Sequence, residues 1–363
     1  MSDLFLSYKP DAEQALDRME AWWHGAILDR ATIQLTAPKE NRRPLPSKHH
    51  ASYCERWMDV EYQVACADIN AANTYWAGDA LPSYMPNLGP EILTACYGAE
   101  LNFTDSTSWS EPILHDWADI AKLKVKTDNT YLRCILDMTR LTTEVGRGKF
   151  VTGLTDIHPG ADLAASFRDP QQLCVDIISE PGHVMALLEH IGKSFFEFYE
   201  LNDSIIKASG QTISTSWLPL FVNNQRYYIP SNDFSIMISN EMFCEFFLPE
   251  LLDEISWLDR SIYHLDGPGA LRHLQTLLDI PKLDAIQYVY GDGAKPASRW
   301  IGVYQRIQDA GKKLHIAVMP EEIDFFMANL HPEGVMMHTS VATADEADAV
   351  LRRVSRWTAK GKY

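Results

Sequence analysis

One short run of the sequence combines an imidazole and a carboxylate in a pattern suited to chemistry: Tyr263-His264-Leu265-Asp266-Gly267-Pro268-Gly269. Side chains alternate along a strand, so His264 and Asp266 would face one side and Leu265 the other. Such a pair can act as a general base, orient a substrate or bind a divalent metal. The structural alternative is that Asp266 caps the next helix and His264 hydrogen-bonds to it.

Other polar or aromatic side chains stand where further apolar runs end or loops begin. Singly, such residues are more often helix caps or packing residues. Because several such residues are expected to lie close together, we assign catalytic roles to some of them and substrate-binding roles to others. The predicted catalytic residues are His264, Asp266 and Asp233. The predicted substrate-binding residues are Asp156, His158, Trp217, Gln287, Tyr290 and Asp105.

Apolar runs of strand length alternate with helical patterns through most of the chain. The expected strands span 31–37, 101–105, 151–156, 226–233, 261–266, 285–289, 314–318 and 335–338. Eight such units predict an α/β protein, a single (β/α)8 TIM barrel over 31–358, with an N-terminal helical extension over 1–30. Barrel enzymes place their sites where strands end, which is where the residues above lie. An open, doubly wound sheet is the alternative.

Several segments between these strands carry expectations of their own. Residues 73–90 are rich in Gly, Pro and aromatic residues, which suggests a lid or cleft wall. Residues 181–208 have the pattern of one long amphipathic helix. Residues 212–217 and 226–230 are expected to pair as a β excursion, and 345–357 to form a closing helix.

Composition narrows the class of protein. The 363 residues are 46% hydrophobic and 22% charged, as in a globular protein with a large core, and six cysteines occur singly. A formal charge of −17 would repel nucleic acids and anionic lipid surfaces. Apolar runs are too short for a membrane span, and no signal-peptide pattern begins the sequence. We therefore expect a cytoplasmic protein with no nucleic-acid or membrane partner.

The glycine patterns argue against nucleotide cofactors. The turn Gly291-Asp292-Gly293 lacks both the G-x-G-x-x-G order and the Gly-Lys-Ser/Thr ending of phosphate loops. We therefore expect no nucleotide cofactor and a small-molecule substrate. A homodimer is an option that the sequence leaves open.

The runs SIYHLDGPGALRHLQTLLDI (261–280), DAIQYVY (284–290) and FSIMISNEMFCEFFLPE (234–250) resemble the uroporphyrinogen decarboxylase superfamily. The resemblance covers most of the chain and implies a (β/α)8 barrel. It also implies one of two activities. Some members decarboxylate porphyrinogens, and others are methyltransferases that pass methyl groups to or from corrinoid proteins or thiols.

The sequence departs from the decarboxylase pattern. Those enzymes hold substrate carboxylates with an N-terminal Arg-Gln-Ala-Gly-Arg segment, whereas residues 33–39 here read Ile-Gln-Leu-Thr-Ala-Pro-Lys. Asp105 in Phe103-Thr104-Asp105 is similar to the pyrrole-binding aspartate of the decarboxylases. A mouth lined by aspartates would, however, repel a polycarboxylate.

The methyltransferase pattern is also changed. Those enzymes bind zinc through a His-x-Cys pair and a later cysteine, whereas this chain has His264-Leu265-Asp266 and His338-Thr339-Ser340. The resemblance therefore implies that His264, Asp266 and His338 hold either a divalent metal, such as zinc, or the substrate directly.

These features favour one function and leave two alternatives. The first hypothesis is a methyltransferase-like enzyme that demethylates a small O-, N- or S-methylated compound, with a corrinoid protein as partner and methyl acceptor. The alternatives are a decarboxylase acting on a porphyrinogen-like or small carboxylic acid, and a barrel that only binds a small ligand.

Overall fold

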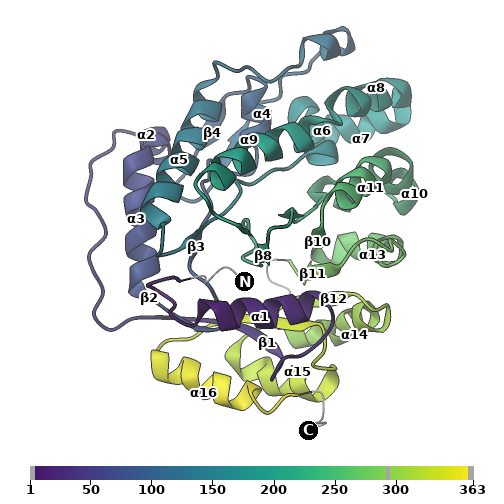
Figure 1. The fold of residues 1–363 in the computed structure, drawn as a ribbon. Helices are drawn as coiled ribbons and strands as arrows, with labels where there is room; N and C mark the ends of the chain where they lie inside the picture. Colours follow the sequence, from purple (N-terminus) through teal and green to yellow (C-terminus); the bar gives the residue numbers. More distant parts are fainter. Residues whose placement is uncertain (1–4, 292–294, 359–363) are drawn as a thin grey trace.

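The computed structural model describes residues 5–291 and 295–358 as a mixed α/β protein with a central, mainly parallel sheet (Figure 1). Asp292 and Gly293 of the glycine-rich turn lie outside the described residues. The sheet has the order β2-β1-β13-β12-β11-β10-β9. Its strands are β1 (Thr32–Pro38), β2 (Thr74–Gly78), β9 (Tyr227–Tyr228), β10 (Arg260–Asp266), β11 (Ala285–Val289), β12 (Lys313–Ala317) and β13 (Val335–Ser340).

The strands expected in the last third of the chain are confirmed to within two residues at each end. β10 to β13 pair in parallel with their neighbours, and β13 also pairs in parallel with β1. The first and last long strands of the chain are therefore neighbours. Apolar runs of this kind form strands because both of their faces are covered.

The second predicted strand exists in shortened form but does not belong to the central sheet. Residues 101–105 contribute only β4 (Leu101–Phe103), which pairs antiparallel with β5 (Ser108–Ser110) in a separate hairpin. The Thr104 backbone N–H donates to the carbonyl of Thr107 at 2.8 Å, and this bond closes the turn that contains Asp105. Two strands lie instead in the segment interpreted as a lid, 73–90: β2 and β3 (Ser83–Tyr84). The first three residues of β2 are only half-buried, so β2 lacks the continuous buried apolar pattern by which the other strands were predicted.

The middle of the chain also differs from expectation. β6 covers only Val151–Thr152 and pairs in parallel with β3. The pairing expected between 212–217 and 226–230 was wrong, because β7 (Ile213–Ser214) pairs with β8 (Val222–Asn223), while β9 joins β10. The predicted helix over 181–208 is two helices, α8 (Pro181–Ile191) and α9 (Ser194–Ala208), interrupted at Gly192 and Lys193.

Helices surround these strands, with α6 to α9 at the top of Figure 1 and α14 to α16 at the bottom. The remaining helices are α1 (Ala12–Trp23), α2 (Tyr53–Met58), α3 (Val60–Asn73), α4 (Ile92–Cys96), α5 (Thr130–Gly146), α6 (Gly160–Arg168), α7 (Pro170–Ser179), α10 (Asn240–Met242), α11 (Leu248–Trp257), α12 (Gly267–Ala270), α13 (Leu274–Leu278), α14 (Ile301–Asp309), α15 (Ile323–Asn329) and α16 (Ala344–Val354). A π-helical turn, η3 (Phe243–Phe247), links α10 to α11. No helix in the described ranges is long and apolar enough to cross a membrane.

The N-terminal helix packs against the beginning of the sheet. Trp22 and Trp23 of α1 share an apolar cluster with Tyr227, Ala285 and Met336, which lie at the first or second position of their strands. α1 therefore covers the amino ends of the strands. Their carboxyl ends, where α/β proteins commonly place sites, lie away from it.

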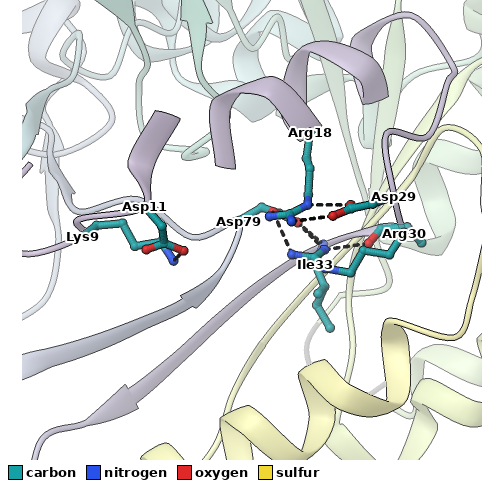
Figure 2. A network of polar contacts seen from close by, with 8 residues as sticks. Lys9, Asp11, Arg18, Asp29, Arg30, Ile33 and Asp79 are labelled. Atoms are coloured by element: carbon teal, nitrogen blue, oxygen red, sulfur yellow. Dashed lines mark hydrogen bonds and ion pairs between the residues drawn. The ribbon is translucent and has the colours of Figure 1, made fainter. Parts of the chain in front are cut away.

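A buried polar network holds this end of the molecule together (Figure 2). Asp79 is fully buried and accepts hydrogen bonds from both terminal nitrogens of Arg30, at 2.7 and 2.9 Å, and from the backbone N–H of Ile33 at 2.9 Å. Arg18 of α1 pairs with Asp29 at 2.6 Å and approaches Asp79 at 3.4 Å. These bonds join α1 and the end of β2 to the start of β1.

Candidate functional site

Three ionisable side chains, which we call the His–Asp–Asp cluster, meet beside the carboxyl ends of the strands. They are His158, in the segment between β6 and α6; Asp162, in the first turn of α6; and Asp233, the first residue of the 3-10 helix η2 (Asp233–Met237). One ligand atom of each lies within 4.8 Å of the others. Within residues 5–291 and 295–358, no other group of three His, Cys, Asp or Glu residues meets this criterion.

Local sequence explains how two members of the cluster come together. Pro159 is the N-cap of α6, and Gly160 begins the helix with φ +57°, a conformation that glycine adopts readily. The turn places Asp162 four residues after His158, so that Asp162 Oδ2 lies 3.6 Å from His158 Nδ1.

Asp162 also fixes the position of Asp233, the third member of the cluster. Its two carboxylate oxygens accept the backbone N–H groups of Asp233, at 3.1 Å, and of Phe234, at 2.9 Å. These bonds satisfy free amides at the start of η2. Asp162 therefore holds α6 and η2 together.

A second carboxylate holds the other side of the imidazole. His158 Nε2 lies 3.2 Å from Asp156 Oδ1. Burial by itself lowers the pKa of His158, but the charges of Asp156 and Asp162 outweigh it and raise that pKa well above its ordinary value. The cluster thus favours a positive charge at this position.

Asp233 lies at the exposed rim of the cluster. Its pKa is raised to about 6, first because surrounding protein displaces part of its hydration and next because Asp162 repels its charge. His158 and His264 act in the opposite direction, and Asp266 adds to the repulsion. His264 and Asp266 are therefore within electrostatic reach of Asp233.

The cluster opens into a cavity of about 510 Å³. Trp109, Phe234 and Met237 form apolar parts of its lining, while Glu91 and Glu111 add carboxylates on the side of β5. A concave pocket with apolar walls and a few converging polar groups is the usual form of a small-molecule site. Imidazole and carboxylate groups in such a pocket can transfer protons or bind a metal.

His264 lies on β10 beside other predicted site residues. Its Nδ1 is 2.7 Å from Oε1 of Gln287, its register partner on β11, and its ring meets the edge of Trp217 with centroids 5.1 Å apart. Asp266 is exposed at the end of β10, and its side chain makes no capping hydrogen bond to α12. The structural interpretation of this pair, with Asp266 as a cap and His264 bonded to it, is therefore wrong.

Three predicted residues lie apart from the His–Asp–Asp cluster. His338 stacks on buried His315, with ring centroids 6.0 Å apart, and burial lowers its pKa. Asp105 lies in the β4–β5 turn, where its carbonyl accepts a bond of 2.6 Å from Arg56. Tyr290 packs half-buried against the main apolar core. The metal set His264, Asp266 and His338 stays a prediction, since the cluster with close ligand atoms is a different one.

Sequence reasoning missed Asp162. Its signal was a carboxylate four residues after His158, in the first turn of a helix that follows a Pro-Gly turn. Sequence reasoning also missed Met237 as a cavity residue; nothing in its local pattern separates it from a packing residue.

Comparison with known proteins gives a likeness in fold. No family model and no curated protein sequence matches the chain. Among solved structures, a methyltransferase from Methanosarcina mazei superposes with a TM-score of 0.61 at 12% identity, over 94% of this chain and 98% of that one. At this identity the match shows that the two chains share a fold.

Proposed function

We propose that this protein is a methyltransferase-like enzyme that removes a methyl group from a small O-, N- or S-methylated compound, with a corrinoid protein as acceptor. The observation that carries the proposal is the cavity of about 510 Å³, which has the His–Asp–Asp cluster on one side and apolar walls on the other. The fold shared with a methyltransferase supports it.

The chemistry of demethylation explains the need for such a cluster. When the bond between the methyl carbon and the heteroatom breaks, the electron pair stays on the heteroatom, which gains negative charge. A positive charge held next to that atom stabilises the transition state. His158, with Asp156 and Asp162 on its two sides, holds positive charge at the cavity wall. A reduced corrinoid on the partner protein would supply the nucleophile that accepts the methyl group.

The predicted pair on β10 keeps a role in this proposal. His264 and Asp266 influence the charge of Asp233, so we place both at the edge of the same site. Trp217 and Gln287, which contact or support His264, would orient the substrate from this side. The apolar wall formed by Trp109, Phe234 and Met237 would receive the body of the substrate.

We also propose that the strands close into one (β/α)8 barrel over 31–358. The parallel pair β1–β13 joins the two ends of the strand series. On the other side, Gly153 N–H donates to Tyr84 O and Leu154 N–H to Thr215 O, both at 2.8 Å, which continues the pairing beyond the short strands. A barrel open at its carboxyl end would let a corrinoid protein approach the cavity.

Methyl transfer to free cob(I)alamin tests the proposed function. The purified full chain would be given methoxyarenes, methylamines and methyl thioethers in separate reactions, and methylcobalamin would be followed by absorbance. We expect transfer from one class and a loss of at least roughly 100-fold in His158→Ala. Asp324→Asn, an exposed carboxylate on α15, is the matched control. Release of carbon dioxide from a carboxylic acid, with no methyl transfer from any class, would overturn the proposal in favour of a decarboxylase.

A further inference from the structure

The two nitrogens of the His158 ring face different carboxylates. Nε2 lies 3.2 Å from Asp156 Oδ1, and Nδ1 lies 3.6 Å from Asp162 Oδ2. Two carboxylates beside one imidazole favour positive charge at both ring nitrogens. Without a cation, a proton on each nitrogen supplies that charge. A metal ion can take the place of the proton on Nδ1, while Nε2–H still faces Asp156.

We propose that this position binds a divalent transition-metal cation, with His158 Nδ1, one oxygen of Asp162 and one oxygen of Asp233 as its ligands. The proposal rests on the proposed function, in which positive charge at the cavity wall activates the leaving heteroatom. It places the cation at residues other than His264, Asp266 and His338.

The distances fit such a site. Ligands about 2.0–2.2 Å from a zinc or similar ion lie roughly 3.0–3.6 Å from each other in tetrahedral or octahedral geometry. His158 Nδ1 and Asp162 Oδ2 already have that spacing, and Asp233, at the exposed rim, has less than about 2 Å to move within the 4.8 Å cluster. The remaining coordination positions would face the cavity of about 510 Å³, where a heteroatom of the substrate can enter.

The surroundings provide what a metal site needs beyond its ligands. Metal-binding histidines commonly donate their other ring N–H to a carboxylate, which fixes the ring and the tautomer. Asp156 holds that position: its Oδ1 is buried, lies 3.2 Å from Nε2 and has no other partner among the described residues. Asp162 is held independently by the backbone N–H groups of Asp233 and Phe234, and each of its oxygens retains a second lone pair.

The balance of charge around His158 also favours a bound cation. Three carboxylates, Asp156, Asp162 and Asp233, surround one imidazole. Among the described residues, no lysine or arginine forms an ion pair with any of the three. A divalent cation would offset this excess of negative charge. One nitrogen and two carboxylate oxygens suit Zn²⁺, Mn²⁺ or Fe²⁺ in preference to a soft monovalent ion.

The test measures metal binding directly. Full-length protein treated with a chelator would be titrated with ZnCl₂ by calorimetry, and with MnCl₂ by the loss of the free-ion electron paramagnetic resonance signal. The manganese titration is a check on the zinc result, because Mn²⁺ has less preference than Zn²⁺ for a thiol such as the exposed Cys54. We expect one ion per chain, a loss of affinity of at least roughly 100-fold in His158→Ala and Asp233→Asn, and roughly 10- to 100-fold in Asp156→Asn.

The matched control is Asp324→Asn, an exposed aspartate on α15. Asp266→Asn distinguishes the two candidate metal sets, because Asp266 belongs to the set with His264 and His338. Loss of at least roughly 100-fold in Asp233→Asn, with unchanged affinity in Asp324→Asn and a smaller loss in Asp266→Asn, supports the His–Asp–Asp cluster. Asp233→Asn is informative even if His158→Ala fails to fold. Loss in Asp266→Asn alone, or no binding of either ion by the wild type, overturns the proposal. Methyl transfer by metal-free protein would also overturn it while leaving the proposed function intact. Metal binding at the cluster without methyl transfer would support the metal site and contradict the proposed function.

Discussion

Nδ1 of His264 lies 2.7 Å from Oε1 of Gln287, on the neighbouring strand of the parallel sheet. Since the amide oxygen only accepts, Nδ1 carries the proton in this contact, and in the neutral ring Nε2 would keep the lone pair. Trp217 meets the same ring at its edge. Gln287 thus fixes both the orientation and the tautomer of His264.

This relationship predicts the effect of Gln287→Leu. Losing a hydrogen bond of about 1 kcal/mol that orients a site residue should lower kcat for the proposed methyl transfer roughly 5-fold. The ¹⁵N shifts of the His264 ring, measured by NMR, should show a mixture of tautomers. Gln275→Leu, on α13, is the control for a change of amide to alkyl. Unchanged ¹⁵N shifts in Gln287→Leu would contradict the positioning role.

The buried network at the amino end of the strands predicts a large stability effect. Asp79→Asn leaves the buried guanidinium of Arg30 without its carboxylate, and breaking a buried pair from one side costs about 3–5 kcal/mol. Asp119→Asn breaks an exposed pair with Lys122 and should cost less than about 1 kcal/mol. Urea denaturation measures both. Equal losses in the two variants would show that the network contributes little.

Glu250 predicts a dependence of stability on pH. Both of its carboxylate oxygens are buried and have no hydrogen-bond partner in the part of the chain that the structure describes. Burial, followed by repulsion from Asp253, raises its pKa from 4.5 to about 7. Below pH 4.5 the group is protonated in the folded and unfolded states alike. As pH rises from 4.5 to 7 the unfolded state ionises first, so the free energy of unfolding falls, and the loss is complete above pH 7.

Glu250→Gln should therefore be more stable than the wild type at pH 8, by about 1–3 kcal/mol, and similar to it at pH 4. Urea denaturation at pH 4, 6 and 8 measures the difference. Glu245→Gln, which removes an exposed carboxylate from η3, controls for the change in net charge. A difference between Glu250→Gln and the wild type that stays constant with pH would contradict the assignment.

The start of α6 predicts opposite outcomes for two glycines. Gly160 has φ +57°, and a Cβ there would lie 2.8 Å from Oε2 of Glu250, so Gly160→Ala should destabilise the protein by at least about 1–2 kcal/mol. Gly182 lies in α8 with nothing within 4 Å of an added Cβ, so Gly182→Ala should stabilise it by about 0.4–1 kcal/mol. Thermal unfolding of the two variants and the wild type measures these changes in stability. A neutral Gly160→Ala would show that the turn before Asp162 tolerates rearrangement.

The sequence by itself determined the regular last third of the chain and singled out two of the three residues that form the His–Asp–Asp cluster. β10 to β13 follow from short apolar runs separated by helical patterns, because each run carries its own strand signal. His158 and Asp233 were named because each lies at or just after the end of an expected strand, 151–156 and 226–233.

Only the tertiary structure decided which residues meet. Asp162 joins the site through bonds to the backbone of Asp233 and Phe234, 71 and 72 positions along the chain, and the His264 ring takes Gln287, 23 positions away, as its partner in place of Asp266. Likewise, β2 takes the place in the central sheet that was expected for 101–105, while β4 pairs with β5 in a separate hairpin. Local patterns record whether a segment can be buried, whereas strand pairing and side-chain contacts depend on the free energy of the whole packed arrangement.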